Sequence, residues 1–295
     1  MTIAKAGRLW DAPPDRSARG YQRLAIEVFS RHLLQTGDLD PVYIALNACG
    51  WTEAQRLRWL VAYIAFYHCG AACYLSQFVG AAFWDEVRRA TVNEAPAPIG
   101  ARWPRGHERR HFRGRQAMTA VDQWAARWCQ PEGMFAYMAA VAPSFADVTA
   151  RAKEHRSVGD WLSFKIVDLV DACLDGHVDQ RDAEYFLYER PRASLVRVWR
   201  ERFEREPKNE MSAAKEMIAH LQAELRDCTI PHKPGRPIDL FCLETVSCKF
   251  ASHLSGHYPL YNDIREIRKG LQPCRHSCNE VDQFEAVMPP LPLVE

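Results

Sequence analysis

Hydrophobic positions recur mostly at helical spacing along this chain. Between residues 20 and 36 (GYQRLAIEVFSRHLLQT), apolar side chains return every three or four positions, and TGDLDP ends the pattern. The stretch DLDPVYIALNACGWTEAQRLRWLVAYIAFYHCG predicts two further helices, with Thr52 as the N-cap of the second. The helical spacing continues over 82–94, until NEAPAPIG breaks it.

The same spacing dominates the rest of the chain. It predicts helices over QAMTAVDQWAARWC, 147–155, 158–174 (with Gly176 as C-cap), DAEYFLYERPRASLVRVWRERFERE and MSAAKEMIAHLQAELRD. After a proline-rich loop at 231–237, the sequence IDLFCLETVSCKFASHLSGHYPLYNDIREIRKGL predicts a helix, a turn at SGHYP and a second helix. Because no segment alternates as several strands would, we expect a mainly α fold, a multi-helix bundle.

We interpret residues 1–295 as a single α-helical domain. Within it we expect an N-terminal helical lobe at about 20–95 and a C-terminal helix–turn–helix lobe at about 238–285. The longest apolar stretch, 59–84, is interrupted by glycines and polar residues, which favours buried core helix over a membrane span. The first residues lack the apolar segment of a signal peptide, so we expect a cytoplasmic protein without membrane association.

Composition adds one constraint on the cysteines. Ten cysteines in a chain without a secretion signal are expected to be reduced. Two close pairs, Cys69 with Cys73 and Cys274 with Cys278, have CxxxC spacing, which is unlike the tight CxxC of common zinc sites. We therefore expect small buried thiols and no dedicated metal site.

Positive charge is concentrated in one short segment, although the formal net charge of the chain is only +1. Residues 102–115 (RWPRGHERRHFRGR) contain six arginines and two histidines against one glutamate. Arginine binds phosphate oxygens bidentately and stays charged at any working pH. The segment therefore indicates local binding of an anion, and a basic surface loop paired with acidic neighbours is the alternative. The candidate anion-binding residues are Arg105, Arg109, Arg110, His111 and Arg113.

A second candidate lies in GDWLSFKIVDLVDACL. Helical spacing places Trp161, Lys165 and Asp168 on one face. An exposed Lys165–Asp168 pair would have little consequence. A partly buried pair beside the tryptophan would be a candidate for proton transfer or anion positioning, and the spacing leaves both interpretations open.

The third candidate is the predicted C-terminal helix–turn–helix. Lys249 and His253 share one face of its first helix, and Asp263 and Glu266 share the first turn of its second, near the positive helix N-terminus. This arrangement is compatible with a nucleic-acid site. Alternatively, Asp263 or Asn262 simply caps the second helix.

Three stretches together resemble a known family. They are GARWPRGHERRHFRGR, WLSFKIVDLVD and KFASHLSGHYPLYNDIREIRKGL, which lie between residues 100 and 271. They resemble the bacteriophage amino acid:DNA transferases, also called α-glutamyl/putrescinyl-thymine pyrophosphorylases, which take part in thymine hypermodification. That family is distantly similar to helix–hairpin–helix DNA glycosylases, so the resemblance implies a glycosylase-like helical fold.

The resemblance implies a substrate and its partners. The substrate would be double-stranded DNA in which 5-hydroxymethyluracil carries a pyrophosphate, and a free amino acid such as glycine would replace that pyrophosphate through its amine. No cofactor is implied because the base is already activated, and a divalent ion on the pyrophosphate is compatible with the chemistry. The reaction would take place in the cytoplasm of an infected bacterial cell.

The resemblance also implies roles for the candidate residues. The arginine segment would stabilise the charge that develops on the leaving pyrophosphate. Asp263, which follows the turn as an aspartate does in the glycosylases, would be the main base, with Glu266 or Asp168 as alternatives. Lys165 would bind either the carboxylate of the amino acid or the pyrophosphate. The further candidates for contact with DNA or pyrophosphate are Lys249, His253 and Arg268.

Two other functions share these features. A DNA glycosylase or lyase acting on a modified base would use the same carboxylate but cut the glycosidic bond, and it would not need an arginine clamp. A non-catalytic helical DNA-binding protein would use the arginines but not Asp263. The turn SGHYP lacks the Gly-x-Gly character that lets backbone amides approach a phosphate, so docking of DNA at this turn is less well supported.

Overall fold

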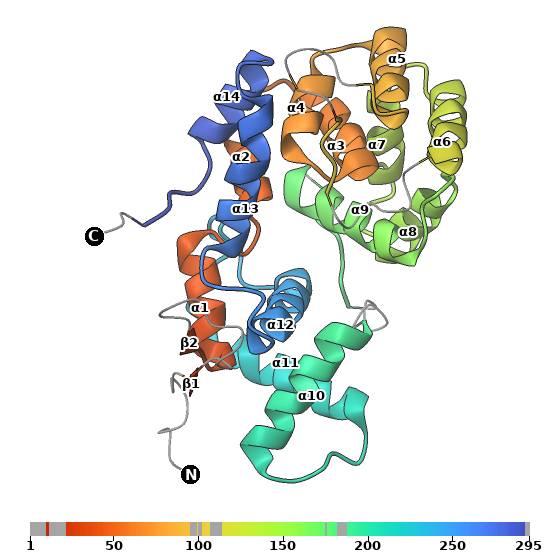
Figure 1. Ribbon diagram of the computed structural model, residues 1–295. Coiled ribbons are helices and arrows are strands. Elements are labelled where there is room, and N and C mark those ends of the chain that lie inside the picture. Colours follow the sequence, from red (N-terminus) through yellow and green to blue (C-terminus); the bar gives the residue numbers. More distant parts are fainter. Residues whose placement is uncertain are drawn as a thin grey trace. The chain divides into compact units, whose positions relative to one another are not determined.

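A computed structural model describes residues 10–11, 22–94, 99, 102–106, 114–174, 176–181 and 188–292 of the chain (Figure 1). Helices dominate this part of the chain, which confirms the expected mainly α class. Two short strands, β1 (Trp10–Asp11) and β2 (Gln22–Arg23), pair in antiparallel fashion. Likeness to the glycosylase fold stays a prediction.

The chain divides into two compact units. The first consists of Met1–Pro41, Glu184–Ile264 and Pro289–Glu295, and the second of Val42–Ala183 and Arg265–Met288. Both expected lobes, 20–95 and 238–285, contribute residues to both units. The units are therefore interleaved along the sequence rather than consecutive.

Within the described residues, the first unit contains four helices and the beginning of a fifth. These are α1 (Ile26–Thr36), α10 (Glu189–Phe203), α11 (Glu210–Glu224), α12 (Leu240–Leu254) and the start of α13 (Asn262–Leu271). Helix α10 packs against α11 and α12, and α1 packs against α12. Where α1 packs against α12, the centroids of the buried Phe29 and Phe250 rings are 5.5 Å apart.

The second unit surrounds one buried helix, α3 (Glu53–Phe66), which packs against α4, α7 and α9. Every residue of α3 from Leu57 to Phe66 is buried, as expected for a helix that is largely apolar on all faces. The other elements are α2 (Pro41–Ala48), α4 (Cys69–Ser76), α5 (Gly80–Thr91), α6 (Gly114–Arg127), α7 (Glu132–Ala139), α8 (Phe145–Lys153), α9 (Asp160–Cys173), the rest of α13, the 3₁₀ helix η4 (Gln272–Cys274) and α14 (Asn279–Ala286).

Local signals predicted some helix ends and missed others. The Thr52 hydroxyl accepts a hydrogen bond from the backbone N–H of Gln55 at 3.3 Å, which confirms it as the N-cap of α3. Gly176 is not the C-cap of α9, because the helix ends at Cys173 and Leu174 is the capping residue. The apolar stretch 59–84 is buried as expected over much of its length, but it is divided among α3, α4 and α5.

The breaks in this stretch also shorten its helices. Tyr67 ends α3 in the left-handed region, with φ of 51°, and His68 caps α4 by accepting from the N–H of Ala71 at 3.2 Å. None of the helices in the described ranges is long and apolar enough to cross a membrane.

Cys69, Cys73 and Cys274 are buried, and burial raises the pKa of the Cys274 thiol to about 12.

Candidate functional site

Asp263, in the first turn of α13, forms an ion pair with Lys249 of α12. Its Oδ2 lies 2.8 Å from Nζ, and the two side chains are 33% and 12% exposed, respectively. Burial alone would lower the pKa of Lys249, but the carboxylates of Asp263, Asp40 and Asp38 outweigh burial and raise it. Lys249 is therefore held as an ammonium.

The same ammonium also binds the backbone after α1. It donates to the carbonyl oxygen of Asp38 at 2.9 Å and to that of Leu39. It lies 5.6 Å from the centroid of the Tyr258 ring. Lys249 thus binds acceptors within the first unit, and its expected contact with DNA stays a prediction.

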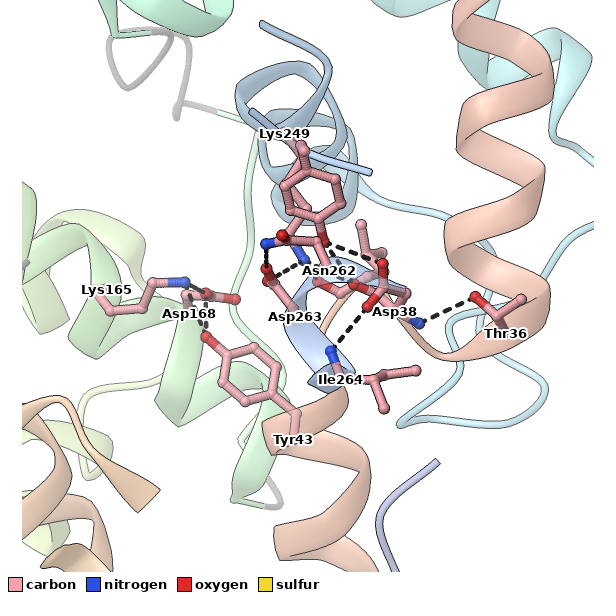
Figure 2. A network of polar contacts seen from close by, with 11 residues as sticks. Thr36, Asp38, Tyr43, Lys165, Asp168, Lys249, Asn262, Asp263 and Ile264 are labelled. Carbon is pink, nitrogen blue, oxygen red and sulfur yellow. Dashed lines mark hydrogen bonds and ion pairs between the residues drawn. The ribbon is translucent and has the colours of Figure 1, made fainter. Parts of the chain in front are cut away.

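Asp38 supplies the cap of α13 from outside that helix (Figure 2). Its buried carboxylate accepts from the backbone N–H of Ile264 at 3.0 Å through Oδ1, and from the Tyr258 hydroxyl at 3.3 Å through Oδ2. Burial raises the pKa of Asp38 to about 6, against the opposing effects of Lys249 and of the bond from Ile264. The cap is 226 residues distant from Ile264 in the sequence.

This external cap bears on the alternative that Asp263 or Asn262 caps α13. Asp38 accepts from a first-turn amide, whereas Asp263 binds Lys249 and accepts from the Asn262 side-chain amide at 3.2 Å. The carboxylate of Asp263 is therefore engaged by side chains, while the side chain as a whole remains one-third exposed. This leaves it accessible for chemistry.

His253 has a structural role. It is fully buried, and its ring stacks on Phe29 with centroids 4.6 Å apart. Nε2 accepts from the backbone N–H of Leu24 at 3.0 Å, so we assign the proton to Nδ1, which donates to the carbonyl of Tyr258 at 2.8 Å. With both ring nitrogens bonded inside the core, His253 stabilises the first unit, and its expected contact with DNA stays a prediction.

The two remaining candidates on α13 differ in setting. Glu266 is exposed one turn after Asp263. Arg268 donates to the carbonyl of Met288 at 3.3 Å, and its guanidinium lies 3.8 Å from the Glu285 carboxylate. Arg268 thus fastens the segment after α14 within the second unit, which is a structural use of its charge.

Lys165 and Asp168 form a buried pair on α9, with Nζ 2.6 Å from Oδ2 and exposed fractions of 13% and 7%. Tyr43 of α2 completes the group (Figure 2). Its hydroxyl donates to Oδ2 of Asp168 at 2.6 Å and accepts from Nζ of Lys165 at 2.9 Å. The pair is therefore buried and not exposed, and its role in proton transfer or anion positioning stays a prediction. Charged hydrogen bonds in such a setting are stronger than in water.

Arg105 lies at the C-terminal end of α5. Its guanidinium donates to the carbonyls of Ala90 and Thr91 at 2.6 and 2.8 Å and lies 5.6 Å from the Phe66 ring centroid. A cation at this end of a helix is stabilising. Arg105 therefore anchors the start of the basic segment. The remaining candidates of that segment lie outside the described residues: Arg109, Arg110, His111 and Arg113.

The comparison with known families defines the class of protein. The model of a family described as amino acid:DNA transferase matches residues 29–258, which is most of the chain. The chain belongs to this family, and it is an enzyme that transfers an amino acid to DNA. A relative named glycinyltransferase, from Pseudomonas phage PaMx11, is 38% identical over 292 residues, which cover 92% of this chain and 98% of that protein.

Sequence reasoning missed two polar residues of these groups. Asp38 lies in TGDLDP, which indicated only the end of a helix. Tyr43 lies in an apolar helical pattern, where its hydroxyl was the one available signal, because buried tyrosines usually need a hydrogen-bond partner. Neither sequence pattern identifies the partner.

Proposed function

We propose that this transferase attaches glycine to DNA that carries 5-pyrophosphoryloxymethyluracil. The amine nitrogen of glycine attacks the 5-methylene carbon, and the bond from that carbon to oxygen breaks. Its electron pair leaves with pyrophosphate, and the proton lost by the nitrogen passes to a base. The new C–N bond leaves the nucleobase attached to its sugar.

The observation that supports this proposal is the 38% sequence identity to a glycinyltransferase, which extends over 92% of this chain and 98% of that protein. Glycine is the donor that this relative's name indicates, and a pyrophosphorylated base supplies the activated carbon that an amine needs. The reaction takes place in the cytoplasm of an infected bacterial cell, where phage DNA is made.

Asp263 is the proposed base. A base is needed because the amine of glycine is protonated at neutral pH and cannot attack until the proton is removed. The side chain of Asp263 is one-third exposed, and its Oδ2 is held at 2.8 Å from Nζ of Lys249. Its position in the first turn of a helix also keeps negative charge near the positive end of the helix dipole.

For Lys165 we propose a role in binding an anion of the reaction. The anion is the carboxylate of glycine or the pyrophosphate. Tyr43 and Asp168 fix the position of the ammonium, at 2.9 and 2.6 Å from Nζ. For the clamp on the leaving group we propose Arg109, Arg110, His111 and Arg113, with Arg105 anchoring the segment on α5.

One observation opposes a lyase. A lyase that attacks through an amine needs that amine neutral, with a lowered pKa. The pKa of Lys249 is raised, and its ammonium is bound by carbonyls and a carboxylate. It is therefore poorly suited to nucleophilic attack.

The decisive experiment uses a duplex with one 5-pyrophosphoryloxymethyluracil and isotopically labelled glycine. Digested nucleosides are read by mass spectrometry, and released pyrophosphate is measured in parallel. We expect a nucleoside that carries the labelled glycine, with one pyrophosphate released per transfer. The same duplex with unmodified 5-hydroxymethyluracil is the control and should give neither product. Loss of the base without incorporation of glycine would instead identify a glycosylase.

Two variants on the same helix separate the candidate bases. Asp263→Asn and Glu266→Gln remove one carboxylate each, one turn apart. If Asp263 is the base, its variant should lose about 100-fold or more in kcat, as expected for loss of a general base. If Glu266→Gln loses more kcat than Asp263→Asn, the base is Glu266.

A further inference from the structure

The first turn of every α-helix leaves four backbone N–H groups without acceptors in the helix. In α13 one of them, the amide of Ile264, donates to the carboxylate of Asp38. Asp38 lies in the loop after α1, where its own N–H donates to the Thr36 hydroxyl at 3.3 Å. The loop after α1 and the first turn of α13 are therefore joined directly.

Lys249 strengthens the same connection from α12. One ammonium donates to the backbone carbonyl of Asp38 and contacts the carboxylate of Asp263 at 2.8 Å. The position of Asp263 thus depends on two supports: the ammonium beside it and the external cap of the turn that carries it.

We propose that Asp38 is a positioning residue of the transfer reaction, which holds the first turn of α13 so that Asp263 presents its carboxylate to the amine in one orientation. This inference rests on the proposed function, because it takes Asp263 as the base.

The geometry explains why the cap comes from elsewhere. An aspartate that caps its own helix turns its carboxylate towards the amides of the next residues and uses its oxygens there. With Asp38 capping the amide of Ile264, the Asp263 carboxylate remains beside Lys249, and the Asp263 side chain is one-third exposed. Displacing a catalytic group by about 1 Å can reduce the rate about 100-fold.

The buried charge of Asp38 distinguishes this role from simple stabilisation. The residue is fully buried, and burial raises the pKa of its carboxyl to about 6. Burying a carboxylate opposes folding. An asparagine would offer an acceptor to the same amide without that charge, so Asp38→Asn is a conservative variant that tests the cap by itself.

The test compares Asp38→Ala and Asp38→Asn with Asp239→Ala as a matched control. Asp239 is another capping aspartate of the first unit: its Oδ1 accepts from the N–H of Cys242 at 3.0 Å, at the start of α12. For each variant, kcat and the KM for glycine are measured on pyrophosphorylated DNA. Hydrogen exchange of the amides in 262–266 is followed by mass spectrometry.

We expect Asp38→Ala to lower kcat by about 10- to 100-fold while KM changes less than about threefold, with faster exchange in 262–266. Asp38→Asn should stay within about threefold of the wild-type kcat. Asp239→Ala should leave kcat within about twofold, because Asp239 caps α12 and not the first turn of α13.

The inference is overturned if Asp38→Ala keeps its kcat, if Asp239→Ala loses as much, or if exchange in 262–266 is unchanged. If Asp38→Ala fails to fold, the test rests on Asp38→Asn. A loss of kcat of about 10-fold or more in that variant, with the amides in 262–266 still protected from hydrogen exchange, would contradict positioning through the cap. If the wild-type protein does not transfer glycine, both the proposed function and this inference are wrong. If the wild type is active and Asp38→Ala has the same kcat, only this inference is wrong.

Discussion

The ammonium of Lys249 and the carboxylate of Asp263 are 2.8 Å apart, although α12 and α13 are separated by the turn that contains SGHYP. Because the same ammonium also binds the carbonyls of Asp38 and Leu39, one side chain joins three segments of the first unit. The pair is thus part of the scaffold, and one of its two members, Asp263, is the proposed base.

Replacing Lys249 by methionine should therefore destabilise the protein strongly. The variant leaves one partly buried carboxylate and two carbonyls without their donor, so we expect the free energy of unfolding to fall by about 2–4 kcal/mol. Urea denaturation measures this loss. Lys208→Met removes an exposed lysine and should change stability by less than about 0.5 kcal/mol. Equal effects of the two variants would contradict the scaffold role.

The buried carboxyl of Asp38 should make stability depend on pH in an unusual direction. Its pKa is about 6 in the folded protein against 3.8 as the ordinary value, so the native state takes up a proton that the unfolded chain does not. Its contribution to stability is therefore fully present below pH 3.8 and is lost as the pH rises through about 6.

Asp38→Asn isolates this contribution from those of other carboxyl groups. At pH 7.5 we expect the variant to be more stable than the wild type, by up to about 3 kcal/mol. The difference should shrink below pH 6 and approach zero near pH 4. Urea unfolding of both proteins at several pH values measures it. A variant that is less stable at pH 7.5 would show that the ionised carboxylate is a net stabiliser.

The role of Lys165 can be resolved with two amine donors. Glycine carries a carboxylate and methylamine does not. If Lys165 binds the carboxylate, Lys165→Met should lower kcat/KM about 10-fold or more for glycine and much less for methylamine, because only glycine loses a charged partner. A similar loss with both donors would assign Lys165 to the pyrophosphate, and no loss with either would remove it from the reaction.

Gly106 should tolerate no side chain. A Cβ atom at this position would lie 2.2 Å from the backbone carbonyl oxygen of Tyr67, and its N–H donates to the carbonyl of Phe66 at 2.9 Å. Gly106→Ala must therefore displace the start of the basic segment from the end of α3. We expect a loss of about 1–3 kcal/mol in the free energy of unfolding, together with lower transfer activity.

Gly50→Ala provides the matched control, because a Cβ there meets no atom within 4 Å. Thermal or urea unfolding of the two alanine variants checks the prediction. If Gly106→Ala is as stable as Gly50→Ala, the close approach at Tyr67 is not a constraint on this segment.

The sequence predicted those features whose determinants are local. Thr52 indicates the start of its helix because the capping hydroxyl accepts from an amide only three residues away. Lys165 and Asp168 are in contact because residues at i and i+3 are neighbours on a helix. Family membership could also be inferred from short motifs, and the match over 29–258 confirms it.

Long-range partners could not be predicted in this way. Tyr43 lies 125 residues from Asp168 and Asp38 lies 226 residues from Ile264, so no periodicity or spacing relates them. The same reason explains why the settings of Arg105 and His253 were not predicted, because their polar groups form tertiary hydrogen bonds with the end of α5 and with Leu24.

The position of Asp38 in the chain also constrains the order in which the protein folds during synthesis. Its acceptors bind a backbone amide and a hydroxyl that the ribosome adds more than two hundred residues later. Residues 42–183, which form most of the second unit, emerge in one continuous piece and can begin to fold as they appear, since domains generally fold as units from the N-terminal side. The first unit cannot be completed until α10, α11, α12 and the start of α13 have been made.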